Sequence, residues 1–160
     1  MREGETTTAL PEAFDAGLYF IGRIHTPWTE RQACPRQGDA KSGPVCTLQI
    51  DPHWREALNG IEQIHELQVL YWMDQARRDL VTQMPGKPEA GRVSRSTFTL
   101  RSPARPNPIA SSHVTLLEAD GLTLKVRGLD CVNDTPLLDL KPLRSRSTQI
   151  IKSQKIYYGT

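Results

Sequence analysis

The sequence predicts a mainly β fold, namely a small single-domain β-barrel with one or two short helices. Many short segments rich in β-branched and aromatic residues follow one another at close spacing, and turn residues separate them. Only one segment carries the start and stop signals of a helix. At 160 residues the chain has the usual size of one domain and can bury a core.

The chain divides into three predicted regions. Residues 1–17 are polar and lack periodicity, which is typical of a flexible N-terminal arm. Residues 18–143 contain the predicted barrel. Residues 144–160 begin with a polar and basic stretch and are predicted to be a C-terminal tail or strand.

In the first half of the barrel region, apolar or alternating composition predicts strands over residues 18–25, 44–50 and 66–73. The last of these is the most apolar segment of the chain, and its aromatic residues favour a core position. The stretch from Trp28 to Gly43 shows no alternation and is predicted to be a long loop. Loops of this length are often functional.

A short helix is predicted over residues 52–60. Asp51 can cap its first turn, Pro52 suits its first position and Gly60 can end it.

In the second half, alternation predicts strands over residues 93–100, 113–119, 122–127 and 137–142. Asp120-Gly121 is the strongest hairpin signal of the chain. Between the first two of these strands, residues 100–112 contain three prolines and predict a stiff loop. Its arginines either face water on a rigid connector or present two guanidinium groups to a ligand.

Composition excludes several classes of protein. No apolar run is long enough for a membrane helix, and no signal peptide precedes Leu18. The three cysteines lack CxxC spacing, so neither structural zinc nor a disulfide framework is expected, and a reducing cytoplasm fits best. The four histidines lie at unrelated spacings, so no metal site is expected. Hydrolase and nucleotide-binding fingerprints are absent.

Charge is distributed unevenly. Residues 1–85 carry 8 Lys and Arg against 12 Asp and Glu, whereas residues 86–160 carry 12 against 6. A basic half is what a polyanion-binding surface requires. It can equally pack against the acidic half or an acidic partner. One charged pair, Asp139 and Lys141, shares a strand face and is either an exposed ion pair or the floor of a site.

Five motifs in fixed order carry a family resemblance. They are Ile21–Trp28 with Pro35–Gln37, Arg101–Pro103, Arg105–Ile109, Gly128–Asp130, and Thr135–Pro142. Together they resemble the TsaA/TrmO (YaeB-like) family of S-adenosylmethionine-dependent tRNA adenine N6-methyltransferases.

The resemblance implies a homodimeric β-barrel that binds S-adenosylmethionine. Its implied partner is tRNA, and the implied acceptor is N6 of the threonylcarbamoylated adenine just 3′ of the anticodon, or a related group. The alternative is a weakly active or non-catalytic barrel that binds S-adenosylmethionine, a nucleotide or RNA in a regulatory role.

The resemblance also implies site residues. Arg101 would hold the cofactor carboxylate, and Asp139 and Lys141 would be catalytic, by orienting the acceptor or cofactor. Arg105 and Asn107 would bind the substrate. The remaining implied cofactor-binding residues are Gln37, Gly38, Asp74, Gln75, Arg127, Gly128, Leu129 and Asp130.

The sequence departs from the family pattern at several places, including Asp74, where a histidine is common, and Leu143, where a tyrosine is usual. Ala110-Ser111 replaces a glycine and an apolar residue, and the alanine should restrict the loop because it disfavours positive φ. Asn133-Asp134 stands where the family usually has Asp-Gly. These departures leave the methyl acceptor open.

Overall fold

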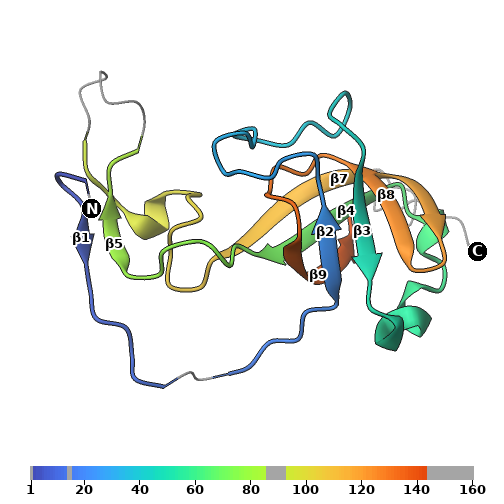
Figure 1. The fold of residues 1–160 in the computed structure, drawn as a ribbon, viewed down its shortest axis with the longest axis horizontal. Helices are drawn as coiled ribbons and strands as arrows, with labels where there is room; N and C mark the ends of the chain where they lie inside the picture. The colour runs from blue at the N-terminus through green and yellow to red at the C-terminus, as the bar shows by residue number, and fades with distance from the viewer. Residues whose placement is uncertain (1, 14–15, 86–92, 144–160) are drawn as a thin grey trace, which may run out of the picture.

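Six antiparallel strands form a closed barrel in the order β2-β3-β8-β7-β4-β9 (Figure 1). The computed structural model describes residues 2–13, 16–85 and 93–143. The barrel strands are β2 (Gly22–His25), β3 (Cys46–Ile50), β4 (Glu66–Trp72), β7 (Ile109–Asp120), β8 (Thr123–Arg127) and β9 (Thr135–Pro142). The predicted fold class is confirmed.

Alternate residues of the strands fill the barrel, as the period of two requires. In β3, Cys46, Leu48 and Ile50 are buried, whereas Gln49 is exposed. The completely buried apolar side chains of the other strands include Ile24, Leu67, Val69, Leu124, Val126 and Leu137.

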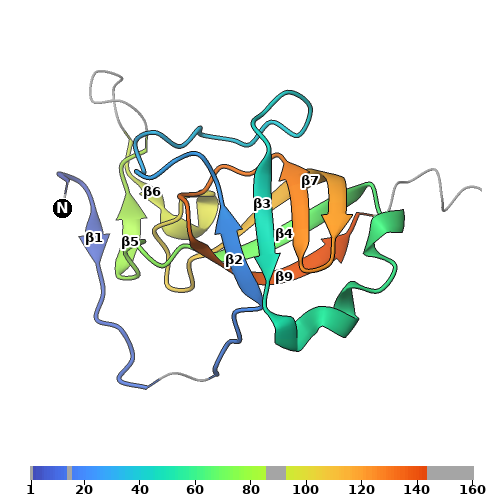
Figure 2. The same ribbon diagram turned by 45° about the vertical axis from the view of Figure 1, so that its right-hand side comes forward.

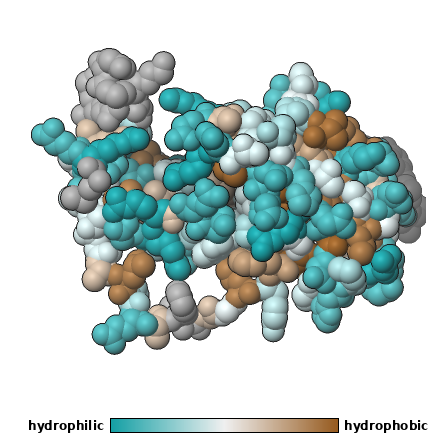
Figure 3. Space-filling model, in the orientation of Figure 1, coloured by the Kyte–Doolittle hydropathy of each residue, from teal (hydrophilic) through white to brown (hydrophobic). Residues whose placement is uncertain are grey.

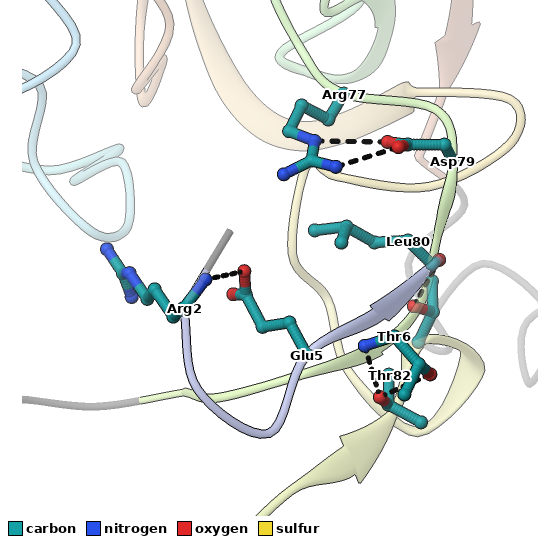
Figure 4. A network of polar contacts seen from close by, with 8 residues as sticks. Arg2, Glu5, Thr6, Arg77, Asp79, Leu80 and Thr82 are labelled. Carbon is teal, nitrogen blue, oxygen red and sulfur yellow. Dashed lines mark hydrogen bonds and ion pairs between the residues drawn. The ribbon is translucent and has the colours of Figure 1, made fainter. Parts of the chain in front are cut away.

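A second, three-stranded sheet lies beside the barrel (Figure 2). It consists of β1 (Thr6–Thr7), β5 (Leu80–Gln83) and β6 (Arg95–Ser96), with β5 in the middle. The backbone N–H of Thr6 donates to the hydroxyl of Thr82 at 2.9 Å, and the two hydroxyls lie 2.7 Å apart (Figure 4). Part of the predicted N-terminal arm is therefore paired with β5, a strand too short to be recognised in the sequence.

The predicted helix is present as a 3-10 helix, η1 (Pro52–Leu58). Asp51 caps it as predicted, since its Oδ1 accepts a hydrogen bond from the His53 N–H at 2.9 Å. Gly60 has φ of +84°, a conformation that suits glycine, and the short helix η2 (Ile61–Gln63) follows it. A third short helix, η3 (Thr97–Thr99), follows β6.

Two predictions for residues 93–112 are wrong. The segment 93–100 is not one strand, because only Arg95–Ser96 pair with β5 before η3 begins. The proline-rich loop ends at Pro108 rather than residue 112, because residues 109–112 already pair with residues 69–72 of β4. Ala110 is thus an ordinary strand residue, and its position needs no positive φ.

The Asp120-Gly121 hairpin is confirmed: it joins β7 to β8, and Gly121 has φ of +57°. The first predicted strand is shorter than expected, and Tyr19 is 81% exposed before β2 begins. Within the described residues, no helix has the length and apolar character needed to cross a membrane. The face shown in Figure 3 is mostly hydrophilic, with hydrophobic side chains in separate groups.

Candidate functional site

The motif-bearing loops lie at one end of the barrel. Antiparallel pairing places the end of β2, the end of β4 and the end of β8 beside the starts of β3, β7 and β9. The loop that follows β2, the proline-rich loop before β7, and the turn between β8 and β9 therefore open on the same side. Segments far apart in the sequence are brought together there.

Two backbone and side-chain contacts tie the loop after β2 to the turn between β8 and β9. The Asn133 N–H donates to the Trp28 carbonyl at 2.7 Å, and the Thr26 hydroxyl donates to the Cys131 carbonyl at 2.9 Å. Asp134, in the position where the family usually has glycine, adopts φ of +66°. Aspartate is among the few residues that tolerate this conformation, so the turn keeps its form without glycine.

A buried polar cluster holds the turn after β8 against the strands. The Tyr71 hydroxyl donates to Asp130 Oδ1 at 2.7 Å, and the Ser112 hydroxyl donates to the same oxygen at 3.0 Å. Tyr71 is 2% exposed. Burial, followed by the negative charge of Asp130, raises the pKa of Tyr71 far above its usual value, so the phenol stays protonated and can donate.

The loop that contains Gln37 and Gly38 lies directly on the same turn. A Cβ added at Gly38 would lie 1.8 Å from the Gly128 carbonyl oxygen, and Gly128 itself has φ of +117°. Further along, the Thr115 hydroxyl donates to the Ala40 carbonyl at 3.0 Å. The predicted cofactor residues at 37–38 and 127–130 are therefore neighbours, and close packing requires glycine at two of them.

A small, partly open pocket with a cavity volume of about 30 Å³ lies at this end of the barrel. Asp74 and Gln75, both predicted to bind the cofactor, line it. The other lining residues are Arg31, Met73, Ala76, Pro103, Val132 and Thr135. Tyr71, which contacts Asp130, does not line the pocket but lies two residues before the pocket-lining Met73.

Sequence reasoning missed several of these residues. Arg31 lies in the long loop predicted to be functional but carried no signal of its own. Tyr71 was assigned to the core together with its strand. A buried tyrosine hydroxyl needs a hydrogen-bond partner, and this requirement could have indicated a polar cluster around it. Ser112 was assigned to a loop.

Other predicted residues have structural roles in addition to, or in place of, a surface role. Arg105 donates to the Ser102 carbonyl at 2.9 Å and to the Leu100 carbonyl, so its guanidinium braces its own loop. Leu129 is 2% exposed, which leaves only its backbone for a ligand. Arg101 is exposed and lies two residues before Pro103, which lines the pocket.

Asp139 and Lys141 form an ion pair at 2.5 Å on β9. Their side chains are 44% and 56% exposed, so the pair has the form of the exposed ion pair considered from the sequence. Neither residue lines the pocket, and the catalytic role stays a prediction.

The donor set suits a zwitterionic ligand with a cationic centre. Arg127 Nε is buried and has no hydrogen-bond partner among the described residues, which is unusual for so polar an atom. Arg31 and Gln75 add donors, and Asp74 adds a carboxylate. Residues 2–13, 16–85 and 93–143 contain no group of three or more His, Cys, Asp or Glu that could hold a metal ion.

Comparison with known proteins assigns the family. Residues 23–147 match the family described as the tRNA-methyltransferase O N-terminal domain. The chain belongs to the TrmO family. This confirms the resemblance that the motifs indicated.

Two similar proteins have names that indicate different functions. The chain is 44% identical to a probable S-adenosyl-L-methionine-binding protein, VirR, of Rhizobium radiobacter, over 98% of this chain and 87% of that protein. It is 36% identical to the tRNA (adenine(37)-N6)-methyltransferase of Escherichia coli, over 76% of this chain and 55% of the enzyme.

Solved structures agree with the TrmO assignment. The crystal structure of TrmO from Pseudomonas aeruginosa superposes with a TM-score of 0.65 at 30% identity, over 83% of this chain and 56% of that one. This chain thus spans little more than half of the E. coli enzyme and of the solved TrmO chain.

Proposed function

We propose that this TrmO-family chain is an S-adenosylmethionine-dependent methyltransferase whose cofactor site is the loop-bearing end of the barrel. The observation that carries the proposal is a pair of contacts: Gly38 packs against Gly128, and Tyr71 at the end of β4 donates to Asp130, so two predicted cofactor-binding segments meet beside β4. The family match and the relatives named as S-adenosylmethionine-binding proteins support the same cofactor. When bound, the cofactor supplies an electrophilic methyl group on sulfur.

The residues at this end have the properties that such a ligand needs. Asp130 has one carboxylate oxygen committed to Tyr71 and Ser112, which fixes the group and leaves the second oxygen for the ligand. Arg127 offers the unpartnered buried Nε for an anionic or accepting atom. Asp74 and Gln75 form the adjacent pocket wall. Positioning of cofactor and acceptor in line would then supply much of the rate.

Binding of S-adenosylmethionine tests the cofactor site directly. Arg101→Ala should weaken binding at least about tenfold, because a charge-assisted pair to the cofactor carboxylate is lost. Its Tm should change little, since the side chain is exposed. The matched control is Arg95→Ala, because Arg95 is also an exposed arginine but lies on β6. This variant should bind S-adenosylmethionine with the wild-type Kd. No detectable heat with the wild-type protein at millimolar ligand would refute the cofactor assignment.

We further propose that the acceptor is N6 of the threonylcarbamoylated adenine beside the anticodon of tRNA, or a related adenine. The E. coli relative, named as a tRNA adenine(37)-N6-methyltransferase, supports this choice. Mass spectrometry of nucleosides from tRNA incubated with the chain and S-adenosylmethionine would detect the methylated product. Unchanged tRNA, with cofactor binding intact, would remove this acceptor while leaving the cofactor site in place.

A second function, a regulatory S-adenosylmethionine-binding barrel, is favoured by one observation. The chain covers 87% of VirR, which is named only as a binding protein, but 55% of the E. coli methyltransferase. Cofactor binding without methyl transfer to any tRNA would support this alternative. The family resemblance also leads us to propose a homodimer, which sedimentation equilibrium tests.

A further inference from the structure

Arg78 connects two walls of the candidate pocket. One wall is the segment after β4, which includes Asp74 and Gln75, and the other is the proline-rich loop, which contributes Pro103. From the first segment, the Arg78 Nε donates to the Pro106 carbonyl at 2.6 Å. Its Nη2 lies 3.5 Å from Asn107 Oδ1, at the limit of a hydrogen bond.

The same guanidinium also lies over an aromatic ring. Its central carbon is 5.5 Å from the centroid of the Trp72 ring, within the range of a cation–π contact. A planar guanidinium can stack through its face while it donates through its edge, whereas a lysine ammonium has no such plane. Trp72 therefore orients Arg78 towards the loop.

The loop depends on donors from outside its own backbone. Pro103, Pro106 and Pro108 have no N–H groups, so the loop cannot pair many of its carbonyls internally. Side chains supply the missing donors: Arg105 from within the loop, Gln83 from β5 to the Ala104 carbonyl at 2.6 Å, and Arg78 from the opposite wall. At the far end, the Met73 N–H donates to the Pro108 carbonyl at 2.8 Å.

We propose that Arg78 is a positioning residue that sets the spacing between these two pocket walls and thereby the affinity for the cofactor. The affinity part of the proposal rests on the proposed cofactor site. The positioning part concerns the loop alone and can be tested without a ligand.

Hydrogen–deuterium exchange of wild type, Arg78→Lys and Arg78→Ala tests the positioning. Both variants should exchange faster at the amides of residues 100–109, with β3 and β8 unchanged. Arg77→Ala is the matched control, because the neighbouring Arg77 pairs with Asp79 at 2.7 Å on the surface (Figure 4). It should leave the exchange of residues 100–109 unaltered.

Calorimetric titration with S-adenosylmethionine, well below the Tm, tests the affinity. Arg78→Lys should raise the Kd at least about tenfold, because the planar guanidinium is lost. Trp72→Leu should raise the Kd by a smaller factor, because it removes only the cation–π contact. Arg77→Ala should change the Kd less than twofold. A lower Tm with wild-type Kd and wild-type loop exchange would overturn the proposal, since a merely structural residue would behave in that way. If neither the wild type nor any variant binds the cofactor but Arg78→Lys still speeds amide exchange in residues 100–109, the proposed function fails and the positioning role stands.

Discussion

Tyr71→Phe removes one hydroxyl from the buried cluster and keeps the ring. The lost contacts are the 2.7 Å hydrogen bond to Asp130 and the 2.9 Å contact with Ser112. A hydrogen bond to a charged group contributes about 1.5–3 kcal/mol. For a protein of this size, that loss corresponds to a fall in Tm of roughly 3–12 °C.

The matched control is Tyr19→Phe. Tyr19 is 81% exposed, so loss of its hydroxyl should change the free energy of unfolding by less than about 0.5 kcal/mol. Urea denaturation at pH 7 measures both variants. Equal stability of the two would refute the view that the cluster holds the turn after β8.

The pH dependence gives an independent check. Burial raises the pKa of Tyr71 in the folded protein above its unfolded value of about 10. The stabilisation that the protonated Tyr71 gives the folded state is therefore complete below pH 10. It is lost as the pH rises further, by about 1.4 kcal/mol of unfolding free energy per pH unit. The Tyr71→Phe variant has no hydroxyl to ionise at this position, so its free energy of unfolding should approach that of the wild type between pH 10 and pH 11. A constant difference between the two proteins would contradict the raised pKa of Tyr71.

Two other substitutions test the packing of the site and the exposed ion pair. Gly38→Ala should destabilise the protein by at least about 2 kcal/mol, because its Cβ would lie 1.8 Å from the Gly128 carbonyl oxygen. The control is Gly17→Ala, which should be neutral because nothing lies within 4 Å of the added Cβ. Equal urea midpoints for the two variants would count against the Gly38 contact. Lys141→Ala should change stability by less than about 1 kcal/mol, because its pair with Asp139 is exposed. A fall in the methyl-transfer rate at unchanged Tm would support the predicted catalytic role, and an unchanged rate would exclude it.

The sequence alone determined the features that depend on neighbouring residues. Asp51 caps η1, the Asp120-Gly121 turn joins β7 to β8, and alternation identifies β3 and β8. These signals are local: a cap, a turn type or a period of two is expressed within a few residues. The ordered motifs likewise identified the family without any structure.

Strand boundaries and the composition of the site were decided by tertiary pairing. Residues 109–112 carry no strong strand signal, yet they extend β7 because β4 offers an edge to pair with. The contacts of Tyr71 with Ser112 and Asp130 join residues 41 and 59 positions apart. Closure of the barrel creates these distances, and no local pattern encodes them. The sequence therefore predicted which loops form the candidate site, whereas the fold decided which side chains in them meet.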